Sequence, residues 1–133
     1  MYKLLIVDNE HYIRLGIRNA IDWSSINVEI IGEAADGLSA LEVAREAHPD
    51  IILLDEPFSN VEPETRMALR KLIKKIHSAY RSTIIFVTHD LSEAFFLADR
   101  ILVLEEGRLA GLGTPQELQE SPPSDLIKDF LLS

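Results

Sequence analysis

Short apolar runs alternate along the chain with segments in which apolar residues recur at helical spacing. The apolar runs predict strands over 3–8, 27–34, 50–55, 83–88 and 100–105. Between them, positions such as Ile13, Ile17 and Ile21 lie on one stripe and predict helices over 10–22, 36–47, 62–80 and 91–98. Strands that alternate with helices favour a mostly parallel sheet with helices on both faces.

The C-terminal segment is richer in turn and capping residues. Residues 105–113, EEGRLAGLG, predict a tight turn that leads into an additional edge strand near 108–113. Thr114 and Pro115 predict the start of a short helix, as N-cap and first helical residue. Apolar residues within 123–132 predict a last helix that docks on the core. Because no linker or repeat separates these elements, we expect residues 1–133 to form a single domain.

Acidic and polar residues come directly after the predicted strands. They are Asp8–Asn9, Asp55–Glu56, Thr88–His89 and Glu105–Glu106. Sites in a parallel sheet form at the carboxyl ends of the strands, so we expect Asp8, Asp55 and Thr88 to converge on one rim. An acid at such a place can accept a phosphoryl group, hold a metal ion or activate a water, and the residues alone leave the three chemistries open.

The charge and the composition of the chain exclude several kinds of binding partner and site. The chain has 13 basic and 22 acidic residues and a formal net charge of −9, which argues against nucleic-acid or anionic-membrane binding, because phosphate contacts need clustered Lys and Arg. The absence of cysteine excludes disulfides and thiolate sites. No apolar run is long enough to span a bilayer and no signal-peptide pattern begins the chain, so we expect a cytoplasmic protein.

The first part of the chain resembles the receiver domain of bacterial response regulators. The resemblance is carried by KLLIVDNEHYIRLGIRNAI, VEIIGEAADGLSALE and HPDIILLD, from residue 1 to about 55. It implies that Asp8 and Asn9, with Asp55, hold a divalent cation, and that Asp55 accepts a phosphoryl group beside Thr88. Mg²⁺ suits such a place, because it prefers hard oxygen ligands and keeps several of its waters.

The second part, from about 50 to 133, resembles the C-terminal part of an ABC-transporter ATPase subunit. IILLDEPFSNVEPETR matches the Walker B strand and D-loop, and TIIFVTHDLSEAFFLADRILVLEEGRLAGLGTPQEL matches the switch-histidine strand and the segment after it. The resemblance implies that Asp55 helps to hold Mg²⁺, that Glu56 polarises the attacking water and that His89 contacts the γ-phosphate.

Each family's set of functional residues is incomplete in this chain. No G-x-x-x-x-G-K-[S/T] segment, signature motif or glutamine loop occurs. A nucleotide would therefore lack the loop that binds its phosphates, and Glu56 and His89 would be vestigial. Receivers place a lysine at the end of the fifth strand, where this chain has Glu105 and Glu106. These acids disfavour a phosphorylated Asp55 by like-charge repulsion.

We therefore interpret the sequence as an engineered chimera joined near the strand at 50–55, with a receiver-derived half, 1–55, and an ATPase-derived half, 56–133. The two halves are predicted to share one flavodoxin-like, three-layer α/β fold with a five-stranded parallel sheet in the order 2-1-3-4-5. We expect no enzymatic activity and no required cofactor, with at most weak Mg²⁺ binding at Asp8, Asn9 and Asp55. The families' partners, a histidine kinase and transporter membrane subunits, are expected to be lost. The alternatives are a phosphoacceptor signalling module using Asp55 and a nucleotide-binding fragment.

Overall fold

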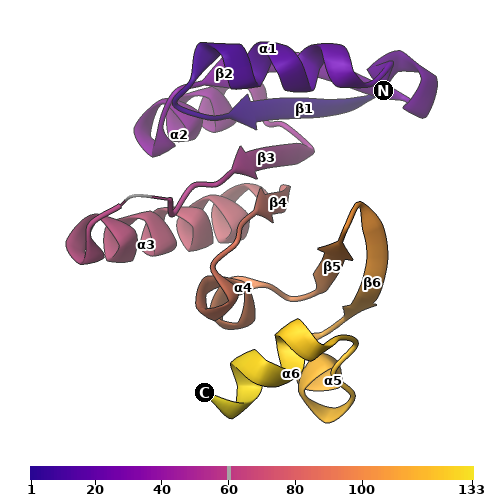
Figure 1. Ribbon diagram of the computed structural model, residues 1–133. Helices are drawn as coiled ribbons and strands as arrows, with labels where there is room; N and C mark the ends of the chain where they lie inside the picture. The colour runs from indigo at the N-terminus through magenta and orange to yellow at the C-terminus, as the bar shows by residue number, and fades with distance from the viewer. Residues whose placement is uncertain (60) are drawn as a thin grey trace. The chain divides into compact units, whose positions relative to one another are not determined.

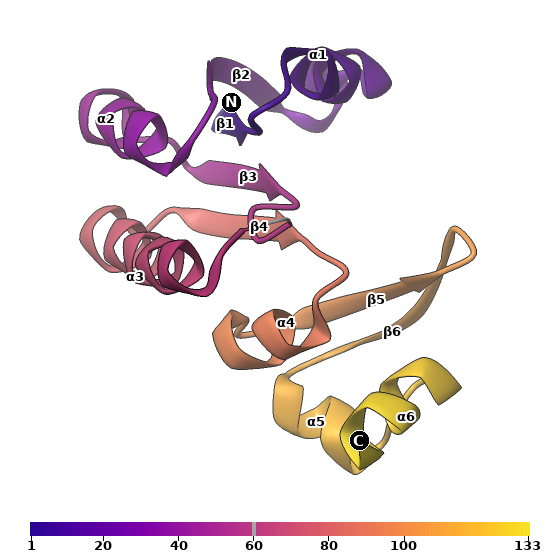
Figure 2. The same cartoon turned by 60° about the vertical axis from the view of Figure 1, so that its left-hand side comes forward.

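The computed structural model describes residues 1–59 and 61–133 and divides the chain into two compact units, Met1–Thr88 and His89–Ser133. Figures 1 and 2 show their elements, and each unit is described by itself. The expectation of a single domain stays a prediction.

Within the described part of the first unit, four parallel strands form one sheet in the order β2-β1-β3-β4. The strands are β1 (Tyr2–Val7), β2 (Val28–Ala34), β3 (Ile51–Asp55) and β4 (Thr83–Val87). β1 and β3 pair from Leu4↔Ile51 to Val7↔Leu54, and β3 and β4 pair from Ile51↔Thr83 to Asp55↔Val87. The first four strands of the predicted order are confirmed.

Helices cover both faces of this sheet. They are α1 (His11–Ala20), the 3₁₀ helix η1 (Trp23–Ile26), α2 (Gly37–Ala47) and α3 (Pro63–Tyr80). Figure 2 shows α1 on one side of the sheet and α2 with α3 on the other. Because side chains alternate along a strand, Leu4 and Ile6 of β1 face α1, where Ile17 and Trp23 pack against them.

Capping residues set the ends of these helices. The Asp36 side chain accepts a hydrogen bond from the Ser39 backbone N–H at the start of α2 and so caps the helix. α2 and α3 each end on a residue in the left-handed conformation, His48 with φ +49° and Arg81 with φ +57°. Such a residue turns the chain sharply and lets the next strand begin nearby.

The second unit contains α4 (Leu91–Leu97), β5 (Ile101–Glu105), β6 (Arg108–Gly113), α5 (Pro115–Glu120) and α6 (Asp125–Leu132). β5 and β6 form an antiparallel hairpin in which Glu105 pairs with Arg108. The two residues between them, Glu106 and Gly107, both have positive φ, +51° and +74°. Two such residues are the requirement of a type I′ turn, whose twist matches that of paired strands.

A small apolar cluster holds the second unit together. Val103 of β5, Leu118 of α5 and Ile127 of α6 are buried, and Phe95 of α4 and Leu131 of α6 pack against them. α5 begins as predicted, because the Thr114 side chain caps it and Pro115 occupies its first turn.

The predicted fifth strand of the parallel sheet is a correction. Among the described residues, the parallel sheet contains β1 to β4, and β5 pairs with β6 in a two-stranded sheet of its own. The Glu106–Gly107 turn joins β5 to β6, an antiparallel partner two residues away, so the described pairing of β5 is local. The additional strand expected near 108–113 is confirmed as β6.

Candidate functional site

The carboxyl edge of the parallel sheet carries the predicted acids of the first unit. Asp8 comes after the last residue of β1, Asp55 ends β3 and Thr88 comes after β4. Val7 pairs with Leu54, so the acids one step further along are neighbours across the two strands. Thr88 likewise comes after Val87, the partner of Asp55. The register therefore places Asp8, Asp55 and Thr88 at the ends of three adjacent strands.

Asp8 is held tightly by the chain around it. It is only 9% exposed, and its backbone N–H donates to the carbonyl oxygen of Ala34 at 3.1 Å. One carboxylate oxygen, Oδ1, accepts a hydrogen bond from the backbone N–H of Glu10 at 2.7 Å. The side chain is therefore fixed by a local turn, and Asn9, which is exposed, lies within that turn.

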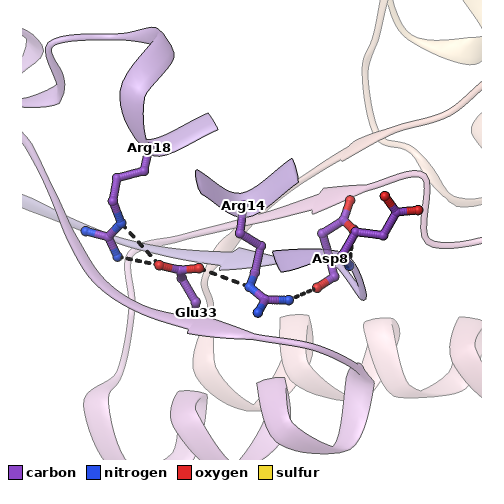
Figure 3. Close-up of polar contacts among 5 residues, drawn as sticks. Asp8, Arg14, Arg18 and Glu33 are labelled. Carbon is purple, nitrogen blue, oxygen red and sulfur yellow. Dashed lines mark hydrogen bonds and ion pairs between the residues drawn. The ribbon is translucent and has the colours of Figure 1, made fainter. Parts of the chain in front are cut away.

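A pair of arginines on α1 reaches the end of β1 and the neighbouring strand (Figure 3). Arg14 Nη1 donates to the backbone oxygen of Asp8 at 2.5 Å, and its Nε donates to Glu33 at 3.0 Å. Arg18 donates to the other carboxylate oxygen of Glu33 at 2.8 and 3.1 Å. The bonds from Arg18 hold the pKa of Glu33 below its ordinary value; Arg14 acts in the same direction, and partial burial opposes them.

The residue after Asp55 has an unusual backbone conformation. Glu56 has φ +49°, in the left-handed region, and its N–H donates to the carbonyl oxygen of Val87 at 2.8 Å. Its own carbonyl oxygen accepts from the Ser59 N–H at 3.2 Å. A bulky residue with positive φ costs free energy, so this turn after β3 is maintained by its surroundings.

The other predicted residues belong to the second unit. His89 begins it, and the next residue, Asp90, caps α4 by accepting from the Glu93 N–H at 3.1 Å. Glu105 ends β5, and Glu106 lies in the hairpin turn. The expected repulsion between Asp55 and the acids Glu105 and Glu106 stays a prediction.

The cation site expected at the strand ends has two carboxylates as its candidate ligands. Over residues 1–59 and 61–133, no group of three or more His, Asp or Glu side chains is placed to hold a metal ion together. Two carboxylates belong to residues at adjacent strand ends, and such a pair would suit an ion such as Mg²⁺ that keeps most of its water ligands. Asp8 and Asp55 would hold it, with Asn9 beside them.

Arg14, Arg18 and Glu33 are residues that the sequence pattern did not single out. Their signal is present but weak, because two arginines four residues apart lie on the same face of a helix. Nothing local indicates that the partner is a glutamate on a strand fifteen and nineteen residues later.

Comparison with solved structures shows a receiver-like fold over nearly the whole chain. The chain is similar to the REC domain of AraT, a response regulator from Geobacillus stearothermophilus, with a TM-score of 0.60 and 27% identity over 97% of this chain and 95% of that one. It is also similar to the response regulator domain of Thermotoga maritima CheB, with a TM-score of 0.50 and 30% identity over 66% and 60%. An ATP-binding subunit of an ABC transporter shares the fold at 23% identity, with a TM-score of 0.52 over 65% of this chain and 38% of that one.

Comparison with curated proteins shows the second likeness. The sulfate/thiosulfate import ATP-binding protein CysA of Bacillus cereus is 46% identical over 92 residues, 69% of this chain and 26% of that protein. The glycine betaine/carnitine/choline transport ATP-binding protein OpuCA of Bacillus subtilis is 42% identical over 85 residues, 64% and 22%. The chain thus spans about a quarter of the length of these relatives.

A protein-family match agrees with the ATPase likeness. The family described as "AAA domain, putative AbiEii toxin, Type IV TA system" matches residues 38–94. The chain combines a receiver-like fold with an ATPase-like C-terminal part, as the two sequence resemblances indicate. Among the described residues, each helix is too short or too polar to cross a membrane.

Proposed function

We propose that this chain is an engineered chimera with no evolved catalytic activity, and that its ligand chemistry is limited to weak divalent-cation binding at Asp8, Asn9 and Asp55. The observation that supports the cation site is the register of β1 and β3, which makes Asp8 and Asp55 neighbours at the carboxyl edge. A two-carboxylate site leaves most of the ion's coordination to water, so binding is expected at millimolar concentrations.

ATP hydrolysis requires a segment that holds the phosphates of the nucleotide against the catalytic residues. Glu56 and His89 stand where the ATPase resemblance places catalytic residues, but the chain has no phosphate-binding loop to hold a substrate against them. We expect calorimetry to show no ATP binding at millimolar nucleotide. ATPase activity that disappears in Glu56→Gln would contradict this proposal directly.

Thermal unfolding tests the cation site. Mg²⁺ or Ca²⁺ at millimolar concentration should raise the melting temperature at neutral pH, because an ion that binds only the folded state stabilises it by mass action. Asp8→Asn should raise the metal-free melting temperature by removing like-charge repulsion, and should weaken the response to metal. Asparagine keeps an oxygen that can accept the Glu10 N–H, so the local turn survives.

Asp55→Asn should have the same two effects, and Asp22→Asn is the matched control on an exposed acid away from the strand ends. If metal leaves the melting temperature of the parent unchanged, and both site variants melt like the parent, the proposed cation binding is wrong.

A phosphoacceptor function is the second candidate, supported by the receiver-like fold over 97% of the chain. A carboxylate oxygen of Asp55 would attack the phosphorus of a small phosphoryl donor, and the donor's leaving oxygen would take the electrons of the broken P–O bond. Intact-mass measurement after incubation with acetyl phosphate and Mg²⁺ tests it, with Asp55→Asn as the control. We expect no added phosphoryl group, and a stable adduct that Asp55→Asn abolishes would favour the signalling function.

In sequence, the chain resembles only a part of each of the two families, so we propose that it has lost the surfaces that the families' partners recognise. We expect neither a histidine kinase nor transporter membrane subunits to bind the chain. Transfer of phosphate from a purified histidine kinase to Asp55 would be the result that contradicts this expectation.

A further inference from the structure

We propose that Arg14 is a positioning residue for the cation site: it anchors the end of β1, and so keeps the Asp8 carboxylate in the orientation that binds the ion. The inference rests on the cation binding proposed above. Its basis is that Arg14 contacts the backbone oxygen of Asp8 and not its carboxylate, of which Oδ1 accepts from the Glu10 N–H.

Arg14 makes two bonds that fix its own geometry. Its Nη1 donates to the Asp8 carbonyl oxygen at 2.5 Å, and its Nε donates to Glu33 at 3.0 Å. The side chain is 15% exposed, and Glu33 is in turn held by Arg18. A planar guanidinium held by two hydrogen bonds has little conformational freedom, so it links α1 rigidly to the end of β1 (Figure 3).

The bond from Arg14 completes a set of hydrogen bonds that immobilise Asp8. The Asp8 N–H donates to the Ala34 carbonyl oxygen on β2. The Asp8 carbonyl oxygen accepts from Arg14 on α1, and its carboxylate Oδ1 accepts from the Glu10 N–H. Outer groups that orient a metal ligand raise affinity, because the ligand then loses little freedom when the ion binds. Arg14 is the member of this set that links the Asp8 turn to a neighbouring helix.

Charge alone predicts the opposite effect, which makes the proposal testable. A cationic side chain next to a cation site repels the ion, so removing its charge should strengthen binding if charge were its only contribution. Positioning predicts that the same removal weakens binding. Arg18 supplies the matched control, because it carries the same charge and contacts the same Glu33 without contacting Asp8.

The experiment is a Mg²⁺ titration monitored by the NMR amide shifts of Asp8, Asn9 and Glu10 in the parent, Arg14→Met and Arg18→Met. We expect Arg14→Met to bind Mg²⁺ about tenfold more weakly than the parent, the lower end of what loss of an outer-shell partner costs. Arg18→Met should bind Mg²⁺ as tightly as the parent or more tightly, because it loses a positive charge and keeps the bond from Arg14 to the Asp8 carbonyl oxygen.

Three results would overturn the inference. Arg14→Met that binds as tightly as the parent, or more tightly, shows that the residue acts through charge or not at all. Equal weakening in Arg18→Met shows that the whole ion-pair layer matters, rather than the contact to Asp8. No saturable shift in the parent means that the proposed cation site itself has failed, which distinguishes that failure from the first two.

If Arg14→Met unfolds, Arg14→Lys takes its place. Lysine keeps the charge, but its single ammonium cannot donate to Asp8 and Glu33 with the geometry of a guanidinium. We expect weaker Mg²⁺ binding in this variant too, and binding equal to that of the parent would overturn the inference.

Discussion

Five residues other than glycine occupy the left-handed region of backbone conformation in the described part of the chain. Asn27, His48, Glu56, Arg81 and Glu106 all have positive φ. Left-handed conformation costs roughly 1–2 kcal/mol for a residue with a Cβ, and glycine avoids that cost. Each of these residues ends an element or makes a turn, so the cost is the consequence of abrupt connections between helices and strands.

Arg81→Gly should raise the free energy of unfolding by about 0.5–1 kcal/mol, because glycine adopts the φ of +57° at the end of α3 without a Cβ clash. The Arg81 N–H bond to the His77 carbonyl oxygen, 3.0 Å, involves the backbone and is retained. Urea unfolding measures the change. Arg45→Gly, on the exposed side of α2, is the control and should lower stability; a drop for both variants would contradict the prediction.

The stability contribution of Glu33 should depend on pH. Its folded-state pKa lies below the ordinary value of 4.5, so its ion pairs with Arg14 and Arg18 stabilise the fold above that value. The contribution is lost as pH falls through the lowered folded-state pKa. The difference in melting temperature between the parent and Glu33→Gln should therefore be greatest near neutral pH and shrink below about pH 4.5. Glu29→Gln, exposed on the same strand, should show no such trend.

At the scale of elements, glycines distinguish a tightly packed position from an open one. A Cβ added at Gly111 of β6 would lie 2.5 Å and 2.7 Å from two ring carbons of Pro123. A Cβ added at Gly16 of α1 would meet nothing within 4 Å. The hairpin and the segment before α6 therefore approach each other closely, while one side of α1 is open.

Gly111→Ala should lower the free energy of unfolding by about 1–3 kcal/mol, because a rigid proline ring cannot yield to the added methyl group. Gly16→Ala is the matched control and should raise stability by about 0.5–1 kcal/mol, as expected for alanine in a helix interior. Chemical denaturation of the two variants beside the parent gives both numbers. A neutral Gly111→Ala would mean that β6 and Pro123 lie further apart than these distances.

Most elements were predictable because each carries its own signals. Thr114 caps α5 where the sequence predicts a cap, and β3 is an apolar run ending in an acid. The membership of β5 in the parallel sheet was predicted wrongly, because an apolar run does not specify which strand lies beside it. The turn at Glu106 and Gly107 joins β5 to β6, and its left-handed conformation is uncommon for glutamate.

The candidate site was predictable in part for a related reason. Asp8 and Asp55 lie at the ends of apolar strands, and parallel strands bring their carboxyl ends to one edge, so their neighbourhood can be inferred from the chain alone. The ion-pair layer of Arg14 and Glu33 depends on the distance between α1 and β2, which the sequence pattern does not specify.

At the scale of the whole molecule, each of the two compact units contains an apolar cluster of its own residues. Leu4, Ile6 and Val28 belong to a cluster of the first unit, and Val103, Leu118 and Ile127 to that of the second. A unit as small as His89–Ser133 buries a limited apolar surface, so its stability depends strongly on each member of its cluster.

Ile127→Ala should therefore destabilise the second unit selectively. Ile127 is fully buried, and its truncation should cost about 2–5 kcal/mol. Amide hydrogen exchange should show loss of protection in β5, β6 and α6, while β1 and β3 keep theirs. Leu5→Ala, at an equally buried position of β1, should have the reverse effect. Equal loss of protection throughout would show that the chain unfolds as the single domain that the sequence predicts.

The Glu106–Gly107 turn also has a consequence for the order of events during folding. It joins strands whose paired residues, such as Glu105 and Arg108, are close along the chain, and hairpins of this kind close in about 1–10 μs. β1 must instead find β3 across a long crossover, from Leu4 to Ile51, and such distant pairings are slow because the intervening chain must be ordered first. β5 and β6, the last strands along the chain, are thus the first that can pair. Formation of the parallel sheet is the slower step and limits the folding rate.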